Sequence, residues 1–375
     1  MKKLLLLLII CLSFCGCSYK ELNELAIANS IGIDYEDGKY KITAQVMKLS
    51  KSSEEASSNS TILYEGSGDS IVSAVKNVSL KYPNYLYLGH LELLVVGKSI
   101  VNDDIEKVFD YFLRSPEARN DIYFLISSEH DAKEILDPKE EEKEEFPTKD
   151  IITTIKNSTI NNGYTIDITL EEFIKNYYEK GIDSLVPNIN LSKDEENKNT
   201  YLDNVAVFKQ NKYLGNLNDK ETLAYNIINN DIEDIVINTH YKDYPVAVSA
   251  TFDKSKLSVK ADKNKVDVNI SINVTGKILE ADGKIDFTEK NVMNIISKNV
   301  EDELVKYTND LIEYCLKNDV DILGIENKIY KFNNKFYSIY KHKNLYEIAN
   351  FNFNNNVKVY NYDSIYKSAS GGIYE

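Results

Sequence analysis

Cys17 is the residue whose chemistry the sequence indicates most clearly. It follows the small residue Gly16, and the chain ahead of this pair has two lysines near its start and an apolar stretch over residues 4–14. The stretch is shorter than the ~20 residues of a membrane-spanning helix, so the pattern is typical of an export signal. It resembles the bacterial lipobox, in which a diacylglycerol is attached to the cysteine thiol before cleavage in front of it. We therefore expect a signal peptide over residues 1–16 and a lipidated Cys17.

The other cysteines support this interpretation. Cys11 and Cys15 would leave with the signal, and only Cys315 would remain as a free thiol. A single thiol cannot form an intramolecular disulfide, although exported proteins often use them. Stable membrane anchoring needs about two acyl chains, which one diacylglycerol supplies.

The residues that usually carry catalysis or bind metals do not form a recognisable set. The histidines have no paired helical spacing of a zinc protease: His90, His130, His240 and His342. Asp319, Asp321 and Gly324 imitate part of a calcium loop, but Tyr330 stands where a bidentate glutamate is required. Scattered carboxylates leave a glycosidase pair open, yet tryptophan, the commonest sugar-stacking side chain, is absent. We expect no enzyme activity, no metal and no cofactor.

Arginine is used in only one place. Arg114 and Arg119 are the only arginines among 44 basic residues. Where a chain otherwise uses lysine, arginine suggests planar, bidentate donation to carboxylates or carbonyls. Three roles are open: a salt bridge that ties a helix to a strand, a contact with a partner protein, or a contact with an anionic ligand.

Composition sets the class of protein. The 375 residues include 59 acidic and 44 basic side chains, a net charge of -15, with 43% hydrophobic and 27% charged residues. These values are ordinary for a globular protein of two or three domains. The acidic balance argues against nucleic-acid binding and against holding an anionic bilayer by charge alone.

Local patterns predict the elements of the first half. Asp37-Gly38 between alternating apolar runs predicts a hairpin, and Asp69 or Ser70 is expected to cap a helix. Residues 91–96, 105–112 and 122–126 predict a strand, a helix and a second strand, hence a parallel pair.

The second half shows a different pattern. A helix is expected near residues 170–180, followed by Pro187 closing that segment and a domain boundary at 191–200. Apolar residues alternate strictly over 266–274, which predicts a sheet with one face in water. Asp282-Gly283 is expected to turn that sheet again.

The longest helix is expected over residues 290–317, with Cys315 on its buried stripe. A cysteine on that stripe is expected to be a packed thiol, because a reactive one needs exposure and positive neighbours.

Placed on these elements, a series of motifs resembles the Ger(x)C family, the lipoprotein C subunits of nutrient germinant receptors in spore-forming Firmicutes. The N-terminal motifs are the lipobox cysteine, an acidic-leucine run and an Ile-Gly-Ile-Asp strand, here Cys17, Glu21–Ala26 and Ile31-Gly32-Ile33-Asp34. The central and C-terminal motifs follow in order, at His90-Leu91, Val95-Val96-Gly97, Tyr111–Arg114, Pro116–Arg119, Ala206–Lys209, Gly215–Asn218 and Asp321–Gly324.

The resemblance implies an α+β (mixed α/β) protein of three domains, with mixed and antiparallel sheets and packed helices. The expected division is a signal peptide at 1–16, an N-terminal domain at 17–138, a small middle domain with its linker at 139–198 and a C-terminal domain at 199–370. The resemblance also implies that the following motif residues have a structural role or contact a partner: Gly32, Asp34, Arg114, Arg119, Asp321 and Gly324.

The resemblance also implies a place in the cell and partners. The subunit would be lipid-anchored on the outer face of the spore inner membrane, beside integral-membrane A and B subunits, and would not be catalytic. Two alternatives stay open: a solute-binding lipoprotein of an ABC-type importer, which needs two similar lobes of parallel sheet, and a secreted hydrolase.

Overall fold

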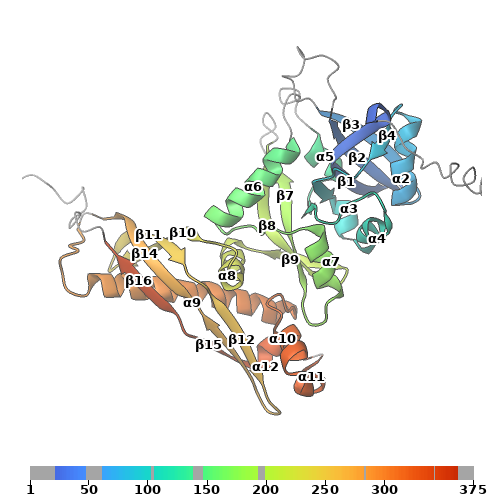
Figure 1. The fold of residues 1–375 in the computed structure, drawn as a ribbon. Coiled ribbons are helices and arrows are strands. Elements are labelled where there is room, and N and C mark those ends of the chain that lie inside the picture. Colours follow the sequence, from blue (N-terminus) through green and yellow to red (C-terminus); the bar gives the residue numbers. More distant parts are fainter. Residues whose placement is uncertain are drawn as a thin grey trace, which may run out of the picture.

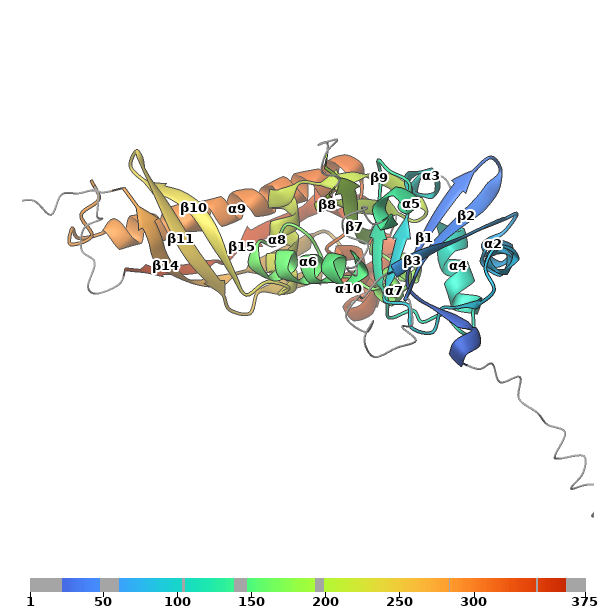
Figure 2. The same cartoon turned by 90° about the horizontal axis from the view of Figure 1, so that it is seen from above.

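The computed structural model describes residues 22–47, 61–102, 105–137, 147–192, 199–282, 284–341 and 343–361. Cys17, the signal peptide, the acidic run at 139–145 and Gly283 lie outside the described residues. The molecule is elongated, with β1 at one end and β10, β11 and β14 at the other (Figures 1 and 2). It is a mixed α/β protein of several units, as the fold class predicted.

The first unit is built on a large mixed sheet. Within the described residues, nine strands follow the order β3-β2-β1-β5-β6-β7-β8-β9, with β4 paired to β1. The strands are β1 (Leu25–Glu36), β2 (Lys39–Met47), β3 (Thr61–Gly68), β4 (Tyr85–Tyr87), β5 (Leu93–Val96), β6 (Tyr123–Ile126), β7 (Ser184–Leu191), β8 (Thr200–Lys209) and β9 (Lys212–Leu217).

The predicted hairpin joins β1 to β2. Asp37 and Gly38 both have positive φ, 53° and 75°, which is the geometry of the tight two-residue turn that matches strand twist. The turn fixes the register, so that Tyr35 pairs with Tyr40 and Ile33 with Ile42. This expectation is confirmed.

The predicted strand–helix–strand unit is also confirmed. β5 and β6 are parallel neighbours, and α4 (Glu106–Arg114) connects them with Val108, Phe109 and Phe112 buried.

The remaining helices of this unit are η1 (Leu22–Glu24), α2 (Ile71–Asn77), η2 (Val78–Leu80), α3 (Lys98–Val101), α5 (Ala132–Leu136), α6 (Pro147–Asn161) and α7 (Leu170–Tyr178). Ser70 caps α2 as expected. We did not expect α6, although Ile151 and Ile155 have helical spacing and are buried.

The large sheet continues through both expected domain boundaries. β7 belongs to the expected middle segment but pairs with β6 on one side and with β8 on the other, so the loop at 192–199 joins two paired strands. The strand pairing does not show whether the segments separated at 138/139 and 198/199 fold independently, so this division of the chain into domains stays a prediction. Pro187 does not close the segment as expected. It lies inside β7, where the register with β8 shifts between Pro187 and Asn188, a position that tolerates a residue without an N–H.

The C-terminal unit has two small sheets and a long helix. Its strands are ordered β10-β11-β14-β16 and β12-β13-β15. They are β10 (Asp234–Tyr241), β11 (Tyr244–Phe252), β12 (Lys256–Ala261), β13 (Val266–Ser271), β14 (Asn273–Ala281), β15 (Ala349–Phe353) and β16 (Asn356–Tyr360). The helices are α8 (Asp219–Asn229), α9 (Val292–Asn318), α10 (Ile325–Phe332), α11 (Asn334–Tyr340) and α12 (Leu345–Ile348).

The alternating strand and the long helix are confirmed with small shifts. Val266, Val268 and Ile270 are buried in β13, Ile272 is buried between the two strands, and Val274 is buried in β14, which belongs to the other sheet. The next named element after β14 is α9, and the turn expected at Asp282-Gly283 includes Gly283, which lies outside the described residues. None of the described helices has the length and apolar composition needed to cross a bilayer.

Candidate functional site

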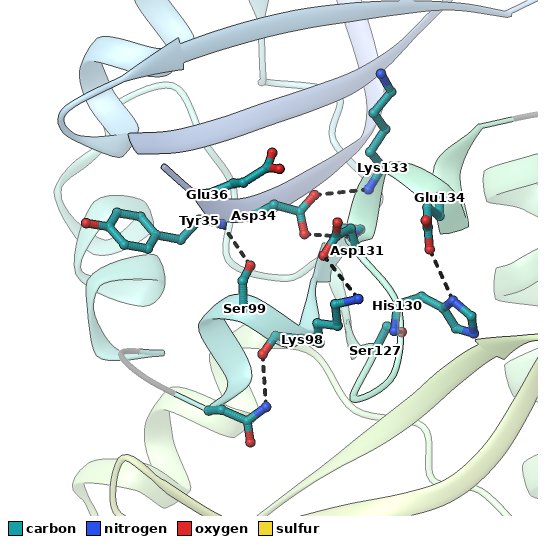
Figure 3. A network of polar contacts seen from close by, with 12 residues as sticks. Asp34, Tyr35, Glu36, Lys98, Ser99, Ser127, His130, Asp131, Lys133 and Glu134 are labelled. Carbon is teal, nitrogen blue, oxygen red and sulfur yellow. Dashed lines mark hydrogen bonds and ion pairs between the residues drawn. The ribbon is translucent and has the colours of Figure 1, made fainter. Parts of the chain in front are cut away.

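Asp34 connects the end of β1 to a helix that begins 98 residues later. Its carboxylate accepts hydrogen bonds from the backbone N–H groups of Ala132, at 2.7 Å, and Lys133, at 3.1 Å (Figure 3). These are the first residues of α5, whose own N-cap residue, Asp131, makes no side-chain cap bond. The first N–H groups of a helix lack intrahelical partners, so Asp34 caps α5 from a distant strand.

Burial shifts the acidity of this carboxyl group. Desolvation raises the pKa of Asp34 to about 6, against the two backbone N–H donors, which lower it. The negative charges of Asp131 and Glu134 add to the rise.

A shell of polar contacts surrounds Asp34. The Tyr35 N–H donates to the Ser99 hydroxyl at 2.9 Å, and Lys98 lies 4.0 Å from the Asp131 carboxylate. Figure 3 shows these residues converging from β1, α3 and the turn before α5. The same shell includes an exposed contact between His130 and Glu134 at 3.1 Å. Asp34 therefore lies at the junction of three segments.

Two glycines of the motifs leave room for this junction. A Cβ atom on Gly97 would lie 1.8 Å from the Asp34 carboxylate oxygen, and one on Gly32 would lie 3.0 Å from the Ala132 Cβ. Real Cβ atoms do not approach that closely, so any side chain at Gly97 would displace the capping carboxylate. Gly32 and Asp34 thus act together in packing α5 against β1.

A buried amide continues the network away from Asp34. Gln45 of β2 donates to the Leu136 carbonyl at the end of α5, and accepts from the Ser30 and Thr148 hydroxyls at 2.9 and 2.6 Å. We did not single out Gln45. The sequence carried no clear signal for it, because β2 also contains Lys39, Lys41 and Thr43, and only the structure shows that Gln45 is fully buried. A buried polar group of this kind needs partners.

Asp321 forms a second junction, between the two units. Its carboxylate accepts from the N–H groups of Ile325, at 2.9 Å, and Glu326, at 2.7 Å, at the start of α10. The Tyr346 hydroxyl donates to it at 2.9 Å. Gly324 precedes α10 with a φ of 64°, a left-handed conformation that glycine adopts without strain.

The partner of Asp321 in the large sheet is Asp183, just before β7. The Asp183 carboxylate accepts from the Asp321 N–H at 2.7 Å, and the Asp183 N–H donates to the Asp321 carbonyl at 2.9 Å. Nearby, Asn327 bonds to the carbonyls of Lys180 and Gly181. Sequence reasoning placed Asp321 in its motif but missed Asp183, whose role depends on a segment 138 residues away.

Burial dominates the acidity of this junction as well. Desolvation raises the pKa of Asp321 to about 6 and also raises the pKa of Asp183. Cys315 lies beside Tyr346, and burial raises the pKa of its thiol far above the ordinary range. The prediction of a packed thiol is confirmed by the full burial of Cys315.

The two arginines form local ion pairs on the surface. Arg114 bonds to Asp110 one turn earlier in α4, at 2.9 Å, and Arg119 bonds to Asp121. Their side chains are 79% and 57% exposed. Neither pair ties a helix to a strand, because each arginine has a carboxylate within its own segment. The contacts with a partner or an anionic ligand remain open.

Arg114 lies on the rim of a cleft of about 690 Å³ between α2, α4 and β4. Ile71, Val75 and Leu86 contribute apolar lining, and Tyr111 adds a hydroxyl whose pKa burial raises to about 12. We call it the α2–α4 cleft. An apolar floor with charges of both signs on the rim suits a polypeptide surface or a small amphipathic molecule.

The described residues contain no group of three or more histidines, cysteines or carboxylates that could hold a metal ion. Among the described motif residues, Asp34 and Asp321 hydrogen-bond to distant segments, Gly32 lies close to α5, and Gly324 has positive φ before α10.

Two family models match the chain. One is described as the spore germination protein N-terminal domain and matches residues 18–191; the other is described as spore germination B3/GerAC like, C-terminal, and matches residues 203–362. Two relatives from Bacillus subtilis (strain 168) are similar along most of their length. Spore germination protein B3 is 24% identical over 319 residues, covering 82% of this chain and 83% of the relative. Spore germination protein KC is 23% identical over 355 residues, covering 88% and 86%.

The fold is similar to that in a crystal structure of the GerBC protein. The TM-score is 0.54 at 18% identity, with 88% of this chain and 96% of that chain covered. A similarity at this identity shows that the two chains share their architecture.

Proposed function

Because the chain belongs to the Ger(x)C family of spore germination proteins, we propose that it is the C subunit of a nutrient germinant receptor, needed for germination in response to nutrients. The observation that carries the proposal is that the N-terminal and the C-terminal family models match successive parts of the chain, residues 18–191 and 203–362. The names of the relatives place them in spore germination.

The subunit is anchored by a diacylglycerol on Cys17, after cleavage of residues 1–16. This follows from the lipobox pattern of the sequence. Its place is the outer face of the spore inner membrane, beside the integral-membrane A and B subunits.

Its role is assembly rather than catalysis. Asp34 is buried and Asp321 is hydrogen-bonded within structural junctions, whereas Arg114 and Arg119 are exposed. We assign the arginines to contact with the partner subunits. The importer alternative needs two similar lobes of parallel sheet, and the large sheet here is mixed while the small sheets contain antiparallel pairs.

The test uses spores that lack every other nutrient receptor. Deleting the gene should abolish the response to the receptor's nutrients, and the wild-type gene should restore it. Cys17→Ala should fail to restore it and should lose the acyl mass at the mature N-terminus. Cys15→Ala, in the leader, is the matched control and should behave as wild type. Normal germination of the deletion strain would refute the receptor role.

A further inference from the structure

The described chain enters the large sheet beside the segment that precedes β4. The carbonyl of Asn23, in η1, accepts a 2.9 Å hydrogen bond from the side chain of Asn84. Two residues further, Leu25 pairs with Tyr85 as β1 and β4 run parallel. We call residues 22–25, where the described chain begins and joins the sheet, the entry point. The C-terminal end of the segment at 78–85 lies beside it.

A lipid on Cys17 would keep this entry point close to the membrane. Leu22 follows Cys17 by five residues. Because an extended chain spans at most about 3.6 Å per residue, Leu22 would lie within about 18 Å of the acylated cysteine. Asn84, which is hydrogen-bonded to Asn23, would lie close to the membrane with it, and Leu80 precedes Asn84 by four residues.

Leu80 projects from this segment into solvent. It is 80% exposed, whereas Val78, at the start of the same 3₁₀ turn, is fully buried. With three residues per turn, side chains two positions apart point in different directions, so burying Val78 directs Leu80 outward. A single exposed leucine is unremarkable on most surfaces. Its position beside the tether is what distinguishes this one.

The charges around Leu80 are mixed. Lys81 follows it, and Lys76 lies in the last turn of α2; both are exposed. Glu24, also exposed, lies at the entry point. With a net charge of -15, the chain as a whole is repelled by an anionic surface, so attraction must come from short-range contacts. An exposed apolar side chain with lysines nearby is a feature shared with segments that lie in the bilayer interface.

We infer that the segment at 78–85 rests on the bilayer surface, with Leu80 inserted at the boundary between headgroups and acyl chains. The inference depends on the proposed lipidation of Cys17, which supplies the high local concentration that one leucine needs to bind. The contact fixes the orientation of the molecule, so that the β1 end faces the membrane and the C-terminal sheets extend away from it.

The test exploits the absence of tryptophan from the chain. Leu80→Trp introduces a single tryptophan, which can be excited at wavelengths where the tyrosines do not absorb, into the mature chain, residues 17–375. Cys17 is coupled to a maleimide lipid in vesicles of phosphatidylcholine and phosphatidylglycerol, some containing brominated lipid. Cys315 is buried with a raised thiol pKa, so coupling is selective for Cys17. Leu279→Trp is the control: Leu279 is 57% exposed on β14, at the opposite end of the molecule (Figure 2).

Coupling should move the emission of the Leu80→Trp protein to shorter wavelength and give at least threefold stronger quenching by brominated lipid than in the Leu279→Trp protein. Equal emission and quenching for the two proteins would overturn the inference. The segment at 78–85 would then face solvent or contact a protein partner instead of the bilayer. Circular dichroism melting checks that both variants fold. Because the lipid is attached chemically, this result is independent of natural acylation, which mass spectrometry of the mature N-terminus tests separately.

Discussion

Asp183 is joined to the Asp321 backbone by two hydrogen bonds: the Asp321 N–H donates to the Asp183 carboxylate at 2.7 Å, and the Asp183 backbone N–H donates to the Asp321 carbonyl at 2.9 Å. This pair connects the start of β7 to the turn between α9 and α10, and so connects the large sheet to the C-terminal unit. A paired backbone and side chain of this kind resists separation, because each group left unpaired in a buried site costs free energy.

Asp183→Ala should therefore destabilise the protein. The substitution leaves the Asp321 N–H without its partner, at a cost of about 1–3 kcal/mol in the free energy of unfolding. Urea unfolding followed by circular dichroism measures this cost. Asp253→Ala, at an exposed loop position, is the control and should change stability little. Equal stability of the two variants would show that the junction does not hold the units together.

Asp34→Asn should change how stability depends on pH. Because the pKa of Asp34 is raised to about 6 when folded, the folded protein binds a proton more tightly than the unfolded chain does. Its contribution to stability therefore falls as pH rises from about 4 to about 6, by up to about 3 kcal/mol for a shift of two pKa units. The asparagine variant lacks this dependence.

The measurement is the difference in unfolding free energy between wild type and Asp34→Asn, from pH 4.5 to pH 7. The advantage of the wild type should shrink as pH rises. Asp37→Asn makes the same chemical change in the β1–β2 turn and is the matched control. A difference that stays constant across this range would contradict the assignment.

Gly97→Ala should be more harmful than an ordinary glycine substitution. The new Cβ would lie 1.8 Å from the Asp34 carboxylate and 2.7 Å from the Ala132 nitrogen, so the cap of α5 must move. Overpacking of this kind costs typically 1–3 kcal/mol, measured by thermal unfolding. Gly38→Asn is the comparison, because nothing lies within 4 Å and asparagine tolerates positive φ. Similar melting of both variants would count against the tight packing.

Arg114→Ala combined with Arg119→Ala should impair receptor assembly while leaving the fold intact. Exposed ion pairs contribute about 0–1 kcal/mol each, so melting should change little. Co-purification of the membrane complex from spores should fall severalfold. Lys298→Ala is the control, since Lys298 forms exposed ion pairs on α9. Full recovery of the complex with the double variant would remove the arginines from the partner surface.

Cys315 should resist thiol reagents in the folded protein. The thiol is buried and its pKa is raised, so little reactive thiolate forms. In the mature chain with Cys17→Ser, a thiol assay should detect almost nothing until denaturant is added, and then one thiol per chain. Rapid reaction in the native state would show that the α9 stripe opens.

Local signals in the sequence were sufficient for several elements. Asp37-Gly38 predicts its hairpin because only positive φ at both residues matches the twist of the strands. The alternation over 266–274 and the helical stripe ending at Cys315 predict which faces are buried, since each pattern has the period of its own element. The motif order predicts the family, and the lipobox pattern predicts an anchor at Cys17, a residue outside the described part of the structure.

Tertiary structure alone decided what the motif residues contact. Asp34 caps a helix 98 residues away and Asp321 bonds to Asp183, 138 residues away. No local pattern carries such pairings, because they arise when distant segments exclude water together and each buried polar group must find whichever partner lies beside it. The same reason explains why Pro187 lies within a strand and why the large sheet crosses the expected boundary at 198/199: strand pairing is settled by neighbours in space.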